Sequence, residues 1–242
     1  MFGRFKSLVR NIFVYKLWKN RSRFGKFAVL VVYIISFLVT SAYGIAKWYQ
    51  ISNRDEPVVF GATFVPNYAR YFDLDPKETL GAMINDLGIK RFRLVSYWDV
   101  HEKQPGQYDF SELDWQFDMI EAAGGQVSLA MGLRQPRWPE CHGPDWAMAK
   151  PMEEWSVDLN NYMTKVIERY KDRTSLVEYQ LENEFFLSVF GICPDFSRER
   201  LISEAQLVHD LDPDTTLVIS RSNNALGFPV GDPRPDKFAV SV

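Results

Sequence analysis

The residues with the clearest potential for chemistry stand at the end of one predicted strand. Residues 179–184 read Tyr-Gln-Leu-Glu-Asn-Glu, an apolar-edged strand that runs into an Asn-Glu pair. A carboxylic acid in a partly dry setting can protonate a departing oxygen near neutral pH, and a neighbouring amide can hold a hydroxyl. Hydrolysis of a glycosidic bond uses this combination together with a second carboxylate. We therefore take Glu184 as a candidate general acid and Asn183 as a candidate donor to a sugar hydroxyl.

Other polar and aromatic residues fall at the ends of neighbouring predicted strands. Arg93 lies within the second strand, Trp98 follows that strand, and Trp138 and His142 lie in the loop after the third. In barrels of alternating strands and helices, functional groups gather at the carboxyl ends of the strands. Trp98 and Trp138 offer flat faces on which a sugar ring can stack, although a tryptophan here can also plug the barrel. His142 is either a substrate contact or an incidental loop residue.

Two further charged residues in these strands are interpreted as structural. Glu182 shares the alternation phase of Glu184 but lies deeper, where pairing with a basic residue is expected. Arg91 lies near the start of its strand, whereas Arg93 needs a carboxylate partner if it faces inward. The sequence has no HExxH, CxxC, Walker or GxSxG pattern, so we expect no metal and no cofactor.

The elements that carry these residues alternate between strand and helix. Strands of nearly continuous apolar character that alternate with helices indicate a parallel sheet covered on both faces. An open doubly wound sheet and a (β/α)₈ barrel both fit this rhythm. A dinucleotide-binding sheet would have a glycine-rich turn after its first strand, and residues 65–68 are Val-Pro-Asn-Tyr. The fold class predicted is therefore α/β, of the (β/α)₈ TIM-barrel type.

The predicted elements do not fill a whole barrel, which takes about 250 residues. Residues 57–242 supply 186 residues with five strands and part of a sixth, so we expect an incomplete barrel. The predicted strands are 57–64, 90–97, 126–131, 176–183, 215–220 and 237–242. The predicted helices open at Asp75-Pro76, Ser111, Met152 and Ser197 and run to about Leu87, Ala123, Tyr170 and Leu211.

An uncharged run of 20 residues, 27–46, precedes this domain. At 1.5 Å per residue it reaches about 30 Å, the thickness of the hydrocarbon core of a bilayer. Residues 1–26 hold eight Lys or Arg and no acid, which predicts a cytoplasmic N-terminus, a transmembrane helix at 27–46, a linker at 47–56 and an extracytoplasmic domain at 57–242. A cleaved signal peptide is the alternative, although its apolar region is usually about 7–15 residues long.

The charge of the main domain is acidic. Without residues 1–26 the chain has 20 basic and 31 acidic residues. This balance argues against nucleic-acid binding.

The two cysteines, Cys141 and Cys193, are too few for a structural zinc site. In an oxidising compartment they can pair, and two free buried thiols are the alternative.

At this point the chain resembles the clan A glycoside hydrolases, and within them the β-galactosidase families numbered forty-two and thirty-five. Residues 97–110 resemble the family segment after strand two, which ends in a Pro-Gly-x-Tyr-Asp-Phe turn, and residues 180–185 resemble the acid/base motif. The likeness covers roughly residues 58–225. It implies Glu184 as the general acid/base, Asn183 as a donor to the sugar 2-hydroxyl, and Arg93 as a support for the nucleophile.

The resemblance also implies what the chain lacks. In this clan the nucleophile is a glutamate at the end of strand seven, and the sequence reaches only strand six. Barrel order makes the loops after strands three and four neighbours, which predicts a Cys141–Cys193 disulfide. The preferred hypothesis is a membrane-anchored, β-galactosidase-like hydrolase with a carbohydrate substrate. The alternatives are a catalytically inactive carbohydrate-binding or scaffold protein at the cell surface, and an enzyme that modifies its own cell envelope.

Overall fold

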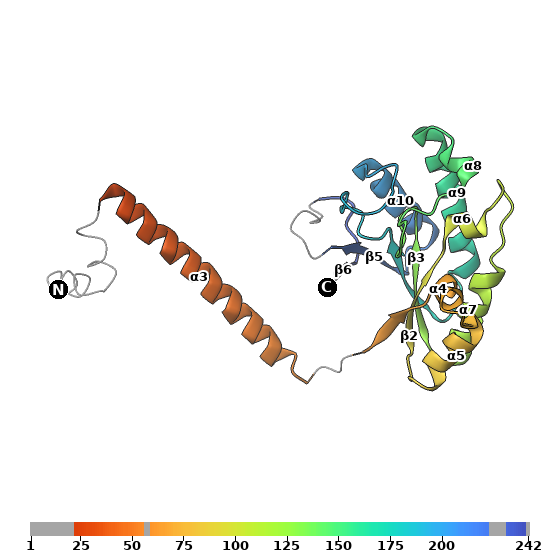
Figure 1. Ribbon diagram of the computed structural model, residues 1–242, viewed down its shortest axis with the longest axis horizontal. Helices are drawn as coiled ribbons and strands as arrows, with labels where there is room; N and C mark the ends of the chain where they lie inside the picture. The colour runs from red at the N-terminus through yellow and green to blue at the C-terminus, as the bar shows by residue number, and fades with distance from the viewer. Residues whose placement is uncertain (1–21, 56–58, 223–230, 241–242) are drawn as a thin grey trace. The chain divides into compact units, whose positions relative to one another are not determined.

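A computed structural model describes residues 22–55, 59–222 and 231–240. The chain divides near residue 58 into two compact units, one containing a single long helix and the other a layer of strands covered by helices (Figure 1). Most of the basic segment 1–26 lies outside the described residues, as do the start of the first predicted strand at 57–58 and the end of the sixth at 241–242.

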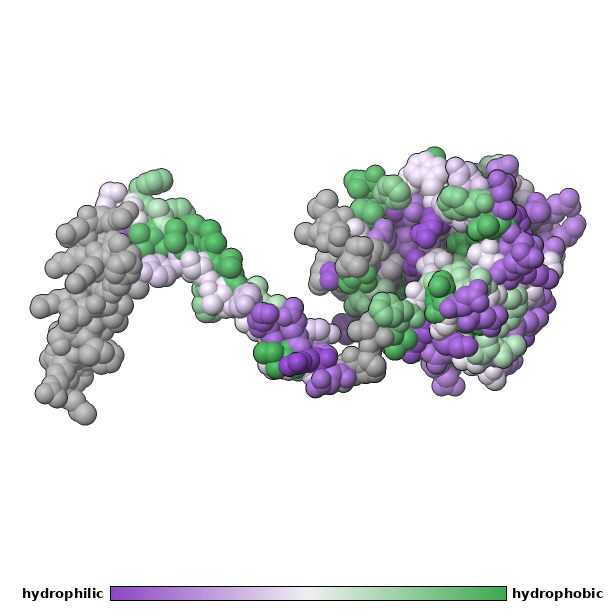
Figure 2. Space-filling model, turned by 60° about the horizontal axis from the view of Figure 1, so that its bottom comes forward, coloured by the Kyte–Doolittle hydropathy of each residue, from purple (hydrophilic) through white to green (hydrophobic). Residues whose placement is uncertain are grey.

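The first unit contains helix α3 (Arg23–Ser52), which has no buried residue. Its length and composition are sufficient to cross a membrane, and a signal sequence near an N-terminus has the same properties. Figure 2 shows hydrophobic side chains along the middle of α3 and hydrophilic ones beyond them. The helix extends past the apolar run 27–46 at both ends. At the C-terminal end it continues because residues 47–52 contain neither Gly nor Pro to stop it. The expected linker at 47–56 is therefore helical over most of its length.

The second unit is a six-stranded parallel sheet in which each strand pairs with the next along the chain. The strands are β1 (Gly61–Thr63), β2 (Arg91–Val95), β3 (Gln126–Met131), β4 (Leu176–Leu181), β5 (Thr216–Arg221) and β6 (Lys237–Val240). Their order in space is β1-β2-β3-β4-β5-β6. A doubly wound sheet would reverse its order at a switch point. The observed order is that of a half-barrel, which confirms the fold class of an incomplete TIM barrel.

Helices cover one face of this sheet (Figure 1). They are α4 (Pro66–Tyr71), α5 (Pro76–Asn85), α6 (Trp98–His101), α7 (Ser111–Ala122), α8 (Asp145–Met148), α9 (Met152–Tyr170) and α10 (Arg198–Leu211). Asp75 caps α5 by accepting hydrogen bonds from the N–H groups of Lys77 and Glu78. The predicted capping by Ser111 is displaced by one residue, because Ser111 is the first residue of α7 and its N–H donates to Asp109. The short helices α4, α6 and α8 lie in stretches where no helix was predicted.

The two faces of the sheet differ in chemistry. Apolar residues of the four central strands pack with the helices in one continuous core. They are Phe92, Leu94, Val127, Leu129, Met131, Tyr179, Leu181, Leu217 and Ile219. The residues between them line a hollow of about 310 Å³ in which polar side chains such as Arg93, Ser128 and Gln180 lie among small apolar ones such as Val177 and Val218. Val95 and Ala130 belong to a second, smaller apolar cluster outside this core. Helices cover one face of the sheet (Figure 1), so the expectation of helices on both faces is wrong.

Trp98 belongs to the helix-side core and not to the rim of the barrel. Its side chain is fully buried, packs against Trp146 and Tyr162, and donates a 2.6 Å hydrogen bond from Nε1 to the carboxylate of Glu102. The predicted role in sugar stacking is therefore wrong, because no face of the indole is accessible. Trp138 differs, since 59% of it is exposed and its ring meets that of Phe190 edge to face.

The two tryptophans should respond differently to truncation. Trp98→Ala leaves a large cavity and removes the donor from one oxygen of the buried Glu102 carboxylate, and we expect it to lower the free energy of unfolding by about 3–5 kcal/mol. Trp138→Ala should change it by no more than about 0.5 kcal/mol, because an exposed side chain loses few contacts. Chemical denaturation of the full chain in detergent measures both. An unchanged stability of Trp98→Ala would contradict the core position of this residue.

Candidate functional site

The chain leaves β4 through three polar residues that do not continue the strand. Glu182 has a φ of 52° and Glu184 a φ of 48°, so both lie in the left-handed region. Residues other than glycine seldom adopt this conformation, and such strain concentrates at functional sites. The two positive φ values break the alternation of the strand, so Glu182 and Glu184 do not share one direction as a continued strand would require.

Glu182 is buried and faces the neighbouring elements. Its carboxylate accepts hydrogen bonds from the backbone N–H groups of Leu133 and Arg134, at 2.7 and 2.8 Å, and from the guanidinium of Arg200 at 2.8 Å. A Cβ atom at Gly132 would lie 2.5 Å from the same carboxylate, so the glycine makes room for it. The expected pairing of Glu182 with a basic residue is confirmed.

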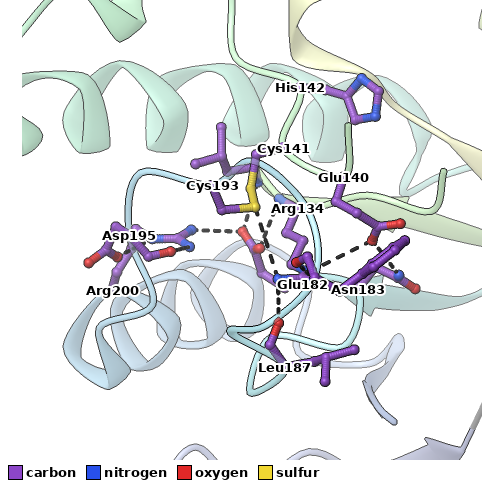
Figure 3. The surroundings of a disulfide bond; sticks show 12 residues. Arg134, Glu140, Cys141, His142, Glu182, Asn183, Leu187, Cys193, Asp195 and Arg200 are labelled. Atoms are coloured by element: carbon purple, nitrogen blue, oxygen red, sulfur yellow. Dashed lines mark hydrogen bonds and ion pairs between the residues drawn. A yellow bond between two sulfur atoms is a disulfide. The ribbon is translucent and has the colours of Figure 1, made fainter. Parts of the chain in front are cut away.

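Arg200 of α10 gathers three acidic side chains, Glu182, Asp195 and Glu204 (Figure 3 shows the first two). Burial alone would raise the pKa of Asp195, but hydrogen bonds from Arg200 and Ser197 hold it below its usual range. Burial raises the pKa of Glu204 well above its usual value, and the nearby charge of Glu182 adds to this. These four residues, called the Arg200 cluster below, therefore hold the start of the loop that follows β4 against α10.

Asn183 is buried beside the Arg200 cluster, and its side-chain amide makes two hydrogen bonds. Its Nδ2 donates to Oε2 of Glu140 at 3.1 Å, and its Oδ1 accepts from Nε2 of Gln180 at 3.3 Å (Figure 3 shows the Glu140 contact). Its backbone N–H donates to the carbonyl of Arg134 at 2.7 Å. Asn183 is thus held by groups from both β4 and the loop after β3.

Glu184 is half-buried, and its backbone is fixed while its carboxylate is left open. The N–H of Glu184 donates to Oγ of Ser220 on β5 at 3.0 Å. Within residues 59–222 and 231–240 the carboxylate makes no hydrogen bond and no ion pair. A carboxyl group that is held in place but has no hydrogen-bond partner in the protein can exchange a proton with a bound molecule.

Arg93 lies in the middle of β2, and its hydrogen-bond partners are uncharged. Nε donates to Thr63 at 2.9 Å and a terminal nitrogen donates to Oε1 of Gln180 at 2.8 Å. The expectation of a carboxylate partner is wrong for the part of the chain that the structure describes. Burial, and then the nearby charge of Arg137, lower the pKa of Arg93.

His142 is largely buried rather than open to a ligand. Its ring lies against that of Tyr97, with centroids 4.0 Å apart. Nε2 lies 3.2 Å from the carbonyl oxygen of Arg137, and Nδ1 lies 3.6 Å from a carboxylate oxygen of Asp99. Both ring nitrogens have protein neighbours, and the substrate contact of His142 stays a prediction.

A disulfide joins Cys141 of the loop after β3 to Cys193 of the loop after β4, the pair expected from barrel order (Figure 3). Arg134 reinforces the junction by donating to the carbonyl oxygens of Leu187 and Phe190, each at 2.9 Å. Two loops that carry rim residues are thereby tied together. Among the described residues, no group of three or more His, Cys, Asp and Glu side chains is arranged to hold a metal ion.

Several residues of this site gave no signal in the sequence. Glu140 stands in a Pro-Glu-Cys stretch, and neither its burial nor its contact with Asn183 follows from spacing. Arg200 and Ser220 reach the loop from α10 and β5, so only the fold reveals their roles. The hollow on the concave face includes Arg93 and Gln180 in its lining but not Glu184.

Comparisons with known proteins identify the fold. No protein-family model matches the sequence, and no curated protein matches it. Solved structures do resemble it. The GH5_18 protein from Streptomyces cattleya in complex with GlcNAc has a TM-score of 0.54 and 13% sequence identity, over 68% of this chain and 44% of that chain.

Two further structures show the same likeness. The polyextremophilic β-galactosidase from the Antarctic haloarchaeon Halorubrum lacusprofundi has a TM-score of 0.52 and 16% identity, over 76% of this chain and 39% of that one. Xylanase 10B from Thermotoga maritima has a TM-score of 0.51 and 15% identity, over 68% and 50%. This chain therefore spans half or less of the length of the three structures. The likeness establishes the partial barrel and does not single out the two β-galactosidase families.

Removing the central carboxylate should be costly. Glu182→Ala leaves the buried Arg200 with less compensation and two backbone N–H groups unpaired, so we expect a loss of about 3–5 kcal/mol in the free energy of unfolding. The matched control is Glu168→Ala, which breaks an exposed ion pair with Lys165 and should cost no more than about 1 kcal/mol. Chemical denaturation of the full chain measures both, and equal losses would contradict the anchoring role of Glu182.

Proposed function

We propose that this chain carries the acid/base half of a membrane-anchored retaining glycoside hydrolase, with Glu184 as the general acid/base. The observation that carries the proposal is the Asn183-Glu184 pair at the carboxyl end of β4 in a barrel-type sheet, with the Glu184 backbone fixed by Ser220 and its carboxylate open. Active groups of barrel enzymes occupy this edge of the sheet. The likeness to solved glycoside hydrolases supports the same assignment.

The roles of the two residues follow from their chemistry. Glu184 gives its proton to the oxygen that leaves with the aglycone, and then removes a proton from the water that completes the reaction. Asn183 holds a ring hydroxyl of the sugar next to the bond that breaks. Interactions of this kind strengthen as positive charge develops on the ring and so favour the transition state.

Retention of configuration needs a second carboxyl group about 5–5.5 Å from the first. The neighbouring acids on β4 and the loop after β3 are already engaged, Glu182 with Arg200 and Glu140 with Asn183. The family pattern assigns the nucleophile to a seventh strand, and we place it outside the six described strands. A β-galactoside is the substrate that the sequence resemblance at 97–110 and 180–185 favours.

The proposed location is the outer face of a cell membrane, with the N-terminus in the cytoplasm. The support comes from α3, which is long and apolar enough to cross a membrane, and from the eight basic residues within 1–26. Positive residues remain on the cytoplasmic side of a first helix. The membrane is then a partner of residues 27–46, and the hydrolase domain meets carbohydrate outside.

Activity measurements test Glu184 directly. Glu184→Gln removes the transferable proton, and we expect kcat/KM on a glycoside with a poor leaving group to fall about 10²- to 10⁴-fold. Cleavage of an activated aryl glycoside should fall much less, because its leaving group departs without protonation. The control is Glu168→Gln, which alters an exposed carboxylate of α9 and should change kcat/KM less than twofold. An equal fall in kcat/KM on both kinds of glycoside would contradict the role of Glu184 as the general acid. Sugar binding without turnover by the unsubstituted protein would favour the carbohydrate-binding alternative.

Membrane extraction tests the anchor. We expect the protein to stay with the membrane pellet in alkaline carbonate and to enter solution only with detergent, because a spanning apolar helix has no favourable aqueous state. Deleting residues 1–52 should release the domain. N-terminal sequencing of the extracted protein provides the control, since a mature chain that begins after residue 41 would show a cleaved signal sequence instead.

A further inference from the structure

A chain of side-chain hydrogen bonds crosses the carboxyl edge of the sheet. It begins at Arg93 on β2, which donates to Oε1 of Gln180 on β4 at 2.8 Å. Nε2 of Gln180 donates to Oδ1 of Asn183 at 3.3 Å, and Nδ2 of Asn183 donates to Oε2 of Glu140 at 3.1 Å. Two amides thus stand between a guanidinium and a carboxylate.

The two charged ends fix the direction of this chain. A guanidinium can only donate hydrogen bonds and an ionised carboxylate can only accept them, whereas an amide side chain can turn over and do either. Because Arg93 only donates, Gln180 must present its oxygen to Arg93 and its NH₂ group to Asn183. Because Glu140 only accepts, Asn183 must present its NH₂ group to Glu140 and its oxygen to Gln180. Both ends require the same orientation of Asn183.

This orientation decides what Asn183 offers to a ligand. Its oxygen is used by Gln180, and one of its two N–H groups is used by Glu140. The second N–H group has no acceptor among the described residues. We propose that Glu140 is a positioning residue that makes Asn183 a hydrogen-bond donor toward the substrate. The site then selects a glycoside whose ring carries a hydroxyl oxygen beside the scissile bond. This inference rests on the proposed function for the identity of the ligand.

The backbone around Glu140 is built to hold its carboxylate in place. Glu140 has a φ of 75° and is only 5% exposed, and its carbonyl accepts a 2.6 Å hydrogen bond from the N–H of Gln135. A Cβ atom at Gly191 would lie 2.8 Å from Cβ of Glu140, so the opposite loop leaves room only for glycine. The adjacent Cys141 is locked by the disulfide. A strained residue that is fixed from several sides is typical of a functional constraint.

The inference is tested by a double-mutant cycle of Glu140→Gln and Asn183→Ala in a protein that includes the strand which, under the proposed function, supplies the nucleophile. Glutamine keeps the size of Glu140 but supplies a donor, so Asn183 is free to turn over. We expect Glu140→Gln to lower kcat/KM about 10- to 100-fold on the parent aryl β-galactoside, as the loss of one charge-assisted hydrogen bond implies. On the 2-deoxy analogue the loss should be less than threefold. In the Asn183→Ala background Glu140→Gln should have no further effect.

Two other variants distinguish loss of Asn183 positioning from a general loss of activity. Glu140→Asp keeps an obligate acceptor and should preserve the ratio of kcat/KM between the parent and 2-deoxy substrates. Glu168→Gln alters an exposed acid of α9 that does not contact Asn183, and its effect should multiply with that of Asn183→Ala. The proposal is overturned if Glu140→Gln lowers kcat/KM equally on the parent and 2-deoxy substrates, or if its effect multiplies with that of Asn183→Ala.

A readout that needs no turnover keeps this inference separate from the proposed function. The side-chain amide of Asn183 is assigned by ¹⁵N NMR in micelles through its absence in Asn183→Ala. Its proton facing Glu140 should resonate downfield in the unsubstituted protein and in Glu168→Gln, and should lose this shift in Glu140→Gln. An unchanged resonance in Glu140→Gln overturns the positioning role. Absence of any glycoside hydrolysis, with the resonance shifted as expected, rejects the hydrolase assignment while leaving the amide orientation supported.

Discussion

The buried carboxylate of Glu182 is the group on which the geometry of the rim depends. Its two oxygens receive the N–H groups of Leu133 and Arg134 and the guanidinium of Arg200, so three successive parts of the chain meet at one side chain. Burying a carboxylate is unfavourable unless such partners replace its water. Here they do, and the loop after β4 therefore has one low-energy path, which delivers Asn183 and Glu184 to the edge of the sheet.

Further contacts at the rim fix the same loops, those after β3 and β4. Arg134 spans from its backbone contact with Glu182 to the carbonyl oxygens of Leu187 and Phe190, and the disulfide ties the same two loops a second time. Ser220 then fixes the Glu184 backbone from β5. The outcome is a site in which the backbone is rigid, the amide of Asn183 is oriented, and one carboxylate is left without a protein partner. Catalytic groups work best when their surroundings, and not the substrate, supply this order.

Much of the fold was predictable, because local patterns determine it. The bounds of β3 and of α9 agree with the apolar periodicities at 126–131 and 152–170, and the barrel type followed from the strand-helix rhythm and the absence of a glycine-rich turn. The position of Glu184 followed from its place after a buried strand. Burial of individual side chains was harder, as Trp98 shows. It is the first residue of a short helix, α6, that turns the indole into the core, and nothing in the sequence distinguishes it from the exposed Trp138.

The partners of the site residues could not be predicted, because they depend on contacts across strands. Arg93 was expected to meet a carboxylate, and instead it ends a chain of amides that begins 87 residues later at Gln180. Spacing along the sequence carries no information about such contacts. It also gives no sign of positive φ angles, and those at Glu140, Glu182 and Glu184 decide where three carboxylates point.

The unequal faces of the sheet have a consequence for how the protein is made. Nearly all of the large apolar core lies between the strands and their helices, whereas the concave face is a hollow lined by polar and small apolar residues together. Each strand pairs with the one synthesised just before it. A nascent chain can thus bury each new strand and helix as they leave the ribosome, without waiting for the opposite wall of a barrel. Parallel pairing is non-local and therefore slow, but pairing in sequence order keeps the closed loops shorter than a permuted strand order would, which limits the time for which strand edges are open to other chains.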